Sequence, residues 1–257
     1  MRFCCLGSGS EGNSLVVETE FGTKTKILVD CGLKFDVLEQ RLSDQKVSAS
    51  DIDGIFITHE HSDHIRSAAK FARIYEIPIF MTHGSFFASK SNFDKVKPLF
   101  FLRSDKTIVL NGLEILPFSI PHDAREPVAL VFKDYKHRLG ILTDAGSITP
   151  HITKTLSKLD GLILEFNYDP NMLKKSMYPP ALKKRILSQF GHLSNSAAGN
   201  LLKEIFHEKL QVIVAAHLSQ KNNTPELVDC ILQNILFDSV RVVIADQSEP
   251  TGWINLS

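Results

Sequence analysis

Short apolar segments alternate with segments of helical periodicity along the chain. Brief runs of β-branched and aromatic residues between polar turns are typical of strands, and apolar residues spaced by three and four positions are typical of helices. These patterns predict strands at 2–6, 14–18, 26–29, 54–57, 77–81, 96–101, 107–110, 113–119, 128–132, 139–142, 161–165, 212–216 and 240–245. They predict helices at 35–42, 65–75, 148–156, 194–209 and 225–236, the last two capped by Ser194 and Thr224. We therefore expect an α/β protein.

The composition is that of a globular chain with a sizeable core, since 43% of the 257 residues are hydrophobic. No linker or low-complexity segment divides the chain, so residues 1–257 are expected to form one domain. The formal net charge is zero, which gives no overall field toward nucleic acid or membrane. No apolar run reaches the roughly 18 residues of a membrane span. The N-terminus shows no signal-peptide pattern, so we expect a cytoplasmic protein with reduced cysteines.

The most informative segment is 55–65, an apolar run that ends in three histidines and an aspartate. Alternate residues of an extended chain point the same way, so His59 and His61 can bind one ion together. Asp63 and His64 follow as the chain turns, and they point to a different place. The segment can therefore hold two ions, and imidazole with carboxylate suits Zn²⁺, Mn²⁺ or Fe²⁺. Packing explains it poorly, because burying so many polar groups without partners is costly.

The pattern His-x-His-x-Asp-His at 59–64 resembles that of the metallo-β-lactamase-fold hydrolases. Three further ligand-type residues follow expected strands in the order that this family has: His122, Asp144 and His217. The resemblance extends over nearly the whole chain. It implies a four-layer αβ/βα sandwich, in which two mixed sheets carry helices on their outer faces.

The same resemblance implies a pair of divalent ions, zinc being the first expectation, with Asp144 as a bridge between them. Asp63 would also orient the attacking water, and Asp30 would support the turn that carries the ligands. Cys31 beside it is either a further ligand or a buried free thiol. Three histidines would hold one ion, and an aspartate with two histidines the other: His59, His61 and His122, and Asp63, His64 and His217.

Several short motifs resemble the YycJ/WalJ-like branch of this superfamily. One residue departs from that branch, because Tyr168 stands where His is common. A histidine at the position of His192 resembles one in the tRNA 3′-processing branch, which implies a general acid that protonates the leaving oxygen. The alternative is that His192 has no catalytic role and lies beside a helix cap or at the surface. The motifs are Gly-Ser-Gly-Ser-Glu-Gly-Asn at 7–13, Glu-x-Asn-x-Asp at 165–169, Tyr-Pro at 178–179, Gly-His-Leu-Ser-Asn at 191–195 and His-Leu-Ser at 217–219.

Substrate contacts are expected around these motifs. The loop 7–13 is either a plain turn or a set of backbone N–H groups that face an anion. Residues 170–203 contain six Lys and Arg residues and no Asp or Glu. This stretch is either a solvated face or a positive rim for a phosphate backbone. The expected substrate contacts are Ser8, Ser10, Asn13, Asn167, Tyr168, Asn195, Lys183, Lys184 and Arg185.

The sequence favours a dinuclear metal-dependent phosphodiesterase that works through a metal-bound hydroxide. The branch resemblance implies a 5′-to-3′ exonuclease on double-stranded DNA, so DNA is the expected partner and a membrane is not. The alternatives are a hydrolase of a small ester, lactone, thioester or cyclic phosphodiester, and a non-catalytic metal-binding scaffold. The complete ligand set argues against the scaffold. The sequence leaves the oligomeric state open, a homodimer included.

Overall fold

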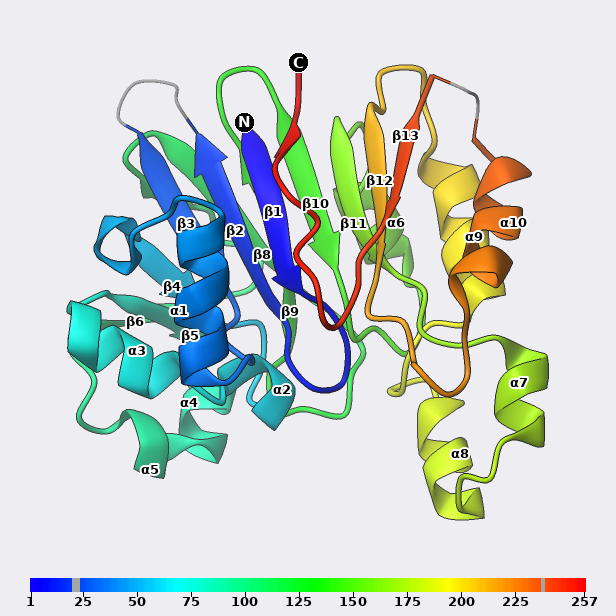
Figure 1. Ribbon diagram of the computed structural model, residues 1–257, viewed down its shortest axis with the longest axis horizontal. Helices are drawn as coiled ribbons and strands as arrows, with labels where there is room; N and C mark the ends of the chain where they lie inside the picture. The colour runs from blue at the N-terminus through cyan, green and yellow to red at the C-terminus, as the bar shows by residue number, and fades with distance from the viewer. Residues whose placement is uncertain (20–23, 237–238) are drawn as a thin grey trace.

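The strands of the protein form two mixed sheets that face each other, as the computed structural model of residues 1–19, 24–236 and 239–257 shows (Figure 1). Each sheet has seven strands, in the orders β14-β1-β2-β3-β4-β5-β6 and β13-β12-β11-β10-β9-β8-β7. The bounds in the first sheet are β1 Arg2–Gly7, β2 Ser14–Thr19, β3 Thr25–Val29, β4 Gly54–Phe56, β5 Ile79–Thr82, β6 Leu99–Leu102 and β14 Ile254–Asn255. Those in the second are β7 Ile108–Leu110, β8 Leu113–Ser119, β9 Val128–Lys133, β10 Arg138–Leu142, β11 Gly161–Glu165, β12 Val212–Ala216 and β13 Arg241–Ile244.

The two sheets repeat one pairing pattern. In the first sheet the pairs from β14 to β3 are antiparallel and those from β3 to β6 are parallel. In the second, the pairs from β7 to β10 are antiparallel and those from β10 to β13 are parallel. The two halves of the chain therefore have the same architecture, which places equivalent strand ends at one edge of the sandwich.

Helices cover the outer face of each sheet and complete four layers. Alternation along the strands sends side chains to two cores; in β2, Leu15 and Val17 face the other sheet while Val16 faces the helices. The expected four-layer sandwich is confirmed. The helices are α1 Phe35–Asp44, η1 Ala49–Asp51, α2 Ser62–Ile65, α3 Ala68–Tyr75, α4 His83–Ala88 and α5 Lys90–Phe93 in the first half, and α6 Pro150–Thr155, α7 Pro170–Lys175, α8 Pro180–Ile186, α9 Asn195–Ile205 and α10 Pro225–Gln233 in the second.

Most expected elements are present within a few residues, and both predicted caps are confirmed. Ser194 and Thr224 accept the N–H groups of Ala197 and Leu227. Asn111 and Gly112 both have positive φ, of 49° and 86°, and join β7 to β8 in a tight hairpin turn, which the Asn-Gly pair favours.

Two expectations about helices were wrong, and two further helices had not been predicted. The helix expected over 65–75 is two helices, because Ser67 leaves the helical path to bond the loop beyond β3: its N–H donates to Cys31 O and its hydroxyl to Leu33 O. The helix expected over 194–209 ends at Ile205, beyond which His207 bonds the carbonyl of Leu159 instead. Helices α7 and α8 lie where only a basic stretch was expected, and both begin with a proline in the first turn. No helix in the described part of the chain is long and apolar enough to cross a bilayer.

Candidate metal centre

Ligand-type side chains meet at one edge of the sandwich, where several strands from both sheets end. Asp30, Asp144 and His217 follow β3, β10 and β12, and each has a left-handed backbone, with φ of 56°, 59° and 57°. A non-glycine residue seldom adopts this conformation. At all three positions the chain turns sharply at the end of its strand, and this edge of the sandwich lies at the bottom of the view in Figure 1.

Three histidines form the first cluster. His59 Nε2 lies 3.1 Å from His61 Nδ1, and His122 Nε2 lies 3.2 Å from the same atom. His59 and His122 are buried, and His61 is partly exposed. Two of the residues come from the loop after β4 and the third from the loop after β8. This is the set that the sequence resemblance gave to the first ion.

Asp63, His64 and His217 form the second cluster, with the Asp63 carboxylate 3.5 Å from His64 Nε2 and 3.7 Å from His217 Nε2. Asp144 lies between the two clusters. One of its carboxylate oxygens is 3.1 Å from His64 Nε2 and the other 3.5 Å from His217 Nδ1. Asp144 also lies within ligand distance of His59, so it can reach both groups.

The hydrogen bonds of the histidines fit a role as metal ligands. His64, His122 and His217 direct Nδ1 to an oxygen acceptor, at Asp30, Gly191 O and Glu165 respectively. A proton on Nδ1 leaves the lone pair of Nε2 free to coordinate, which is how ligating histidines are usually oriented. His217 Nε2 and one Asp144 oxygen are buried and have no hydrogen-bond partner among the described residues. A divalent cation would satisfy both atoms, so the residues present fit the expected metal.

Carboxylates in the site raise the pKa of two histidines of the second cluster, His64 and His217. Burial lowers the pKa of His217, but Asp144, Asp63 and Glu165 outweigh it and raise the pKa to about 10. Burial also lowers the pKa of His64, but Asp30 and Asp144 outweigh this effect and raise the pKa well above its ordinary value. A metal that binds here would displace these protons, so its affinity would rise with pH.

Asp30 lies behind the ligands, where its carboxylate accepts three hydrogen bonds. One oxygen accepts from the Thr58 N–H at 2.9 Å, and the other accepts from His64 Nδ1 at 2.7 Å and from the Thr58 hydroxyl at 2.9 Å. Asp30 therefore orients the strand end that carries His59 and also fixes the ring of His64. Cys31 is fully buried, and burial raises its thiol pKa well above the ordinary range. The ligand clusters of the described residues do not include it.

Glu165 is a buried carboxylate whose role the sequence interpretation missed. One oxygen accepts from His192 Nδ1 at 2.8 Å and from His217 Nδ1 at 3.1 Å. The other accepts the N–H groups of Ala145 and Leu193, each at 3.1 Å. The Glu-x-Asn motif after β11 was the available signal, but only the fold shows that this residue links two histidines.

His192 lies beside the ligands, with its ring centroid 5.5 Å from that of His122 and 5.4 Å from that of His217. Its side chain is 16% exposed, and it faces a cavity of about 210 Å³ together with Asp63, Asp144 and His217. Burial lowers the pKa of His192, but Glu165 and Asp144 outweigh that effect and hold the pKa above its ordinary value.

The residues expected to contact substrate have different positions. Ser10, Asn167 and Arg185 line the cavity. Ser8 and Asn13 are buried against the site itself: the Ser8 hydroxyl accepts the His217 N–H at 2.7 Å, and the Asn13 amide lies 3.1 Å from His64 Nε2. The Ser8 bond therefore fixes the backbone at His217, and the Asn13 amide also donates to the Asp63 carboxylate at 3.3 Å.

The structure does not bring two other expected contacts into this cavity. Asn195 is buried, and its amide exchanges two hydrogen bonds of 2.8 Å with Asn223. Tyr168 is 7% exposed and lines a neighbouring cavity of about 550 Å³, in which His192 also takes part.

Helices α7 and α8 form an arm, residues 170–186, that projects beside the site (Figure 1). Arg185 makes a two-point ion pair with Asp123, at 2.5 and 3.1 Å. Asp123 lies 3.5 Å from His122 Nε2, which places the Arg185 guanidinium at the rim of the first cluster. Lys183 donates to the carbonyl of Lys174, and Lys184 is exposed.

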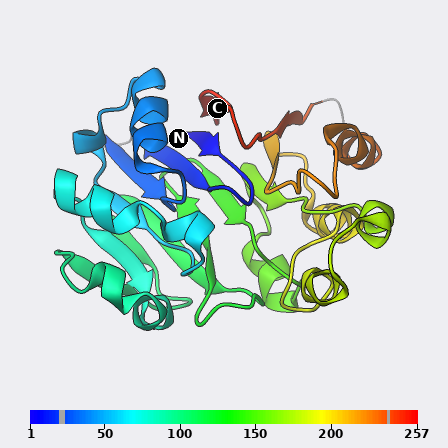
Figure 2. The same cartoon turned by 60° about the horizontal axis from the view of Figure 1, so that its bottom comes forward.

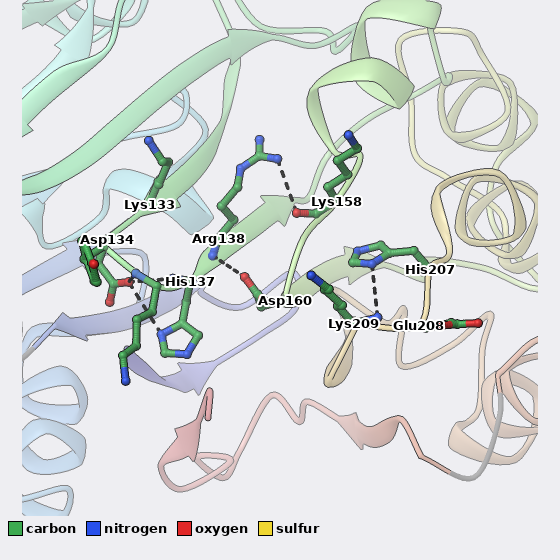
Figure 3. A pocket seen from close by; sticks show the side chains of 11 residues that line it. Lys133, Asp134, His137, Arg138, Lys158, Asp160, His207, Glu208 and Lys209 are labelled. Atoms are coloured by element: carbon green, nitrogen blue, oxygen red, sulfur yellow. Dashed lines mark hydrogen bonds and ion pairs between the residues drawn. The ribbon is translucent and has the colours of Figure 1, made fainter.

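A larger cavity of about 730 Å³ lies at the opposite ends of β10 and β11 (Figure 3). Its basic groups serve mainly to hold loops together. Arg138 donates to the carbonyl of Ser157 and, through its N–H, to the Asp160 carboxylate, and Lys133 pairs with Glu114. This cavity is separate from the ligand clusters.

Comparisons with known proteins agree with this geometry. The profile of a family described as Beta-lactamase superfamily domain matches residues 25–214. Exodeoxyribonuclease YycJ of Bacillus anthracis is 31% identical over 240 residues, which cover 92% of this chain and 89% of the relative. Exodeoxyribonuclease WalJ of Streptococcus pneumoniae is 32% identical over 241 residues, which cover 91% of this chain and 88% of the relative.

Solved structures share the whole architecture. YhfI from Bacillus subtilis, a metallo-β-lactamase fold protein, has a TM-score of 0.76 at 17% identity and covers 97% of this chain and 98% of its own. Zn²⁺-bound PqqB from Methylobacterium extorquens has a TM-score of 0.73 at 14% identity over 100% of both chains. At such identities the likeness concerns the fold alone. With the matched profile and the two relatives above 30% identity, it follows that the chain belongs to the metallo-β-lactamase superfamily of hydrolases.

Proposed function

We propose that the protein is a dinuclear metal-dependent phosphodiesterase that degrades DNA from its ends, with 5′-to-3′ polarity, and that His192 protonates the leaving oxygen. The observation that carries this proposal is the pairing of two ligand clusters around Asp144 with a histidine beside them that is anchored on Glu165. The names of the two exodeoxyribonuclease relatives support DNA as the substrate.

The proposed roles follow from the positions of the side chains. His59, His61 and His122 would hold one ion, Asp63, His64 and His217 the other, and Asp144 both. Two such ions can polarise a phosphoryl group and lower the pKa of an attacking water.

In the hydrolysis, the P–O bond to the leaving sugar breaks and its oxygen takes up a proton. With Nδ1 held by Glu165, His192 can supply that proton from Nε2. Ser10, Asn167 and Arg185 line the cavity in which the phosphate would sit, and Lys183 and Lys184 extend the positive rim.

The decisive experiment compares two substrates with and without His192. His192→Ala should retain metal but lose turnover of 5′-phosphorylated duplex DNA by about 10²–10⁴-fold, the usual contribution of general acid catalysis. An aryl phosphodiester with a nitrophenolate leaving group should lose much less, because that oxygen hardly needs a proton. His151→Ala, an exposed histidine paired with Asp105, is the matched control. Equal losses on both substrates would make the role of His192 structural.

A charge-removal variant tests the substrate class. Replacing Lys183, Lys184 and Arg185 by Ala should weaken DNA binding. It should also reduce the slope of log affinity against log salt concentration by about one for each lost phosphate contact. The same number of changes at the remote cavity, Lys133, Lys136 and Lys158, serves as the control. Normal duplex degradation at every salt concentration, together with efficient hydrolysis of a small ester or cyclic phosphodiester, would favour a small-molecule hydrolase instead.

A further inference from the structure

Aromatic rings from α4 and the edge strand β6 form an exposed surface, the aromatic platform, made of His83, Phe87 and Phe101. His83 stacks on Phe101 with ring centroids 3.6 Å apart and planes 16° apart, and the ring of Phe87 is 22° from parallel to that of His83. Phe87 is 66% exposed and Phe101 40%. Phe86 meets both phenylalanines edge-on and holds them from beneath. The planes of Phe87 and Phe101 therefore lie within 22° of that of His83, and His83 and Phe101 each keep one face that does not stack on the other.

The platform is attached directly to the loops that carry the metal ligands. Glu60, between His59 and His61, accepts from the Ser85 hydroxyl at 3.1 Å and from the Arg125 N–H at 2.7 Å. Glu126, in the loop after His122, accepts from the Gly84 N–H at 2.6 Å. Both views place α4 next to α2, on the side of the site away from the α7–α8 arm (Figures 1 and 2). A strand that leaves the site on this side would pass over the platform.

The segment that carries the platform, residues 83–103, is basic, although the carboxylates of Glu60 and Glu126 lie against the start of α4. In the described residues, the side chains of Lys90, Lys95, Lys97 and Arg103 are exposed and have neither an ion pair nor a hydrogen bond. Asp94 is the sole acidic residue between positions 83 and 103. A second copy of the chain would bring these cations against their own equivalents, which is unfavourable. A polyanion with flat rings fits both the charge and the aromatic faces.

We propose that the aromatic platform binds the unpaired nucleotides of a single nucleic-acid strand, and this rests on the function proposed above. The bases would stack on His83, Phe87 and Phe101, and their phosphates would contact the surrounding lysines. Stacking of this kind accepts any base, because every base has a π-face. The platform would thus hold a frayed or overhanging strand while the metal centre cuts a neighbouring linkage.

The test compares single-stranded binding with and without the rings. The double variant Phe87→Leu/Phe101→Leu keeps the apolar surface but removes two stacking faces. With Zn²⁺ present, and with phosphorothioate linkages to slow cleavage, it should bind a tailed duplex at least about ten-fold more weakly than the wild type, the scale of losing one stacked base. The fluorescence of 2-aminopurine in the tail should be quenched by the wild type and not by the variant. Tyr135→Leu is the control, because Tyr135 is an exposed aromatic residue between β9 and β10 of the other sheet.

The outcomes separate this inference from the proposed function. Equal affinity and equal quenching in wild type and variant would overturn the platform, even if DNA is degraded. If the wild type sediments as a dimer and the variant as a monomer, the rings bury against a second copy, and the inference is also wrong. If the wild type binds the tail and quenches its 2-aminopurine fluorescence but hydrolyses no nucleic acid, the platform inference is supported and the proposed nuclease activity is refuted. A wild type that binds no nucleic acid refutes both.

Discussion

Asp30→Asn is the most exacting test of how the metal centre is held. The change keeps the shape of the side chain, and Asn tolerates the left-handed backbone at this position as Asp does. It removes only a charge and one acceptor. The native carboxylate accepts from the N–H of Thr58 on one oxygen and from Nδ1 of His64 on the other.

The size of the effect follows from counting donors. An amide has one oxygen, so its NH₂ group must face either the Thr58 N–H or the protonated Nδ1 of His64. A buried donor left without an acceptor costs about 1–3 kcal/mol. For a chain of this size, a loss of about 2 kcal/mol lowers the melting temperature by roughly 4–8 °C. If His64 instead loses its orientation, metal affinity should fall by about 10–100-fold, as for other residues behind ligands.

Chelator competition with Zn²⁺ and a thermal melt measure the two effects. Asp53→Asn makes a matched control, because Asp53 also accepts a backbone N–H, that of Lys26, but contacts no ligand. We expect Asp30→Asn to bind metal more weakly while some turnover remains. Unchanged zinc affinity together with an unchanged melting temperature would refute the argument that one buried donor loses its acceptor. A zinc ion coordinated by the Asp30 side chain would show that Asp30 is itself a ligand.

Two further predictions concern the buried carboxylates of Glu165 and Asp134. Glu165→Gln removes the group that raises the pKa of His192 most. Activity that needs protonated His192 is lost as pH rises, so in this variant it should be lost at a lower pH than in the wild type. A pH profile of kcat/KM checks this, and an alkaline limb at the same pH in both proteins would contradict it. The N–H groups of His137 and Lys136 outweigh the effect of burial and lower the pKa of Asp134 in the folded protein. The ionised Asp134 carboxylate therefore stabilises the folded state above the unfolded pKa of about 3.9, and this contribution disappears as pH falls through the lower folded pKa. Asp134→Asn should therefore melt below wild type at pH 7, and the gap should close in acid; a gap of constant size would point to a role without charge.

The gathering of candidate ligands in the loop 59–64 was predictable because it depends on local order. A strand followed by His59, His61, Asp63 and His64 constrains the directions of these side chains within one loop, so the sequence alone brings them together. The two sheets were predictable for a similar reason, since strand runs and the hairpin turn at 111–112 are short-range signals. The resemblance to the superfamily added the order of the downstream candidates His122, Asp144 and His217.

Long-range pairing was not predictable in the same way. Asn195 is the last residue of the motif that contains His192, yet its amide turns inward to Asn223, a contact that only the packing of α9 near the loop before α10 creates. Glu165 gains its role from two histidines that are 27 and 52 positions away. The helix break at Ser67 could not be predicted either, because the helical periodicity of the sequence continues through Ser67. The break depends on the hydrogen bond from Ser67 to the loop beyond β3.

Stability and function oppose each other at the ends of β10 and β12. Asp144 and His217 hold left-handed backbones that cost an L-residue about 1 kcal/mol or more, a cost that glycine escapes. Selection for heat resistance alone would therefore favour glycine at these two positions and erase the centre, whereas the native residues persist only under selection for the reaction. A laboratory evolution scheme for this protein must screen turnover in every round, since its most accessible stabilising substitutions include ones that abolish the enzyme.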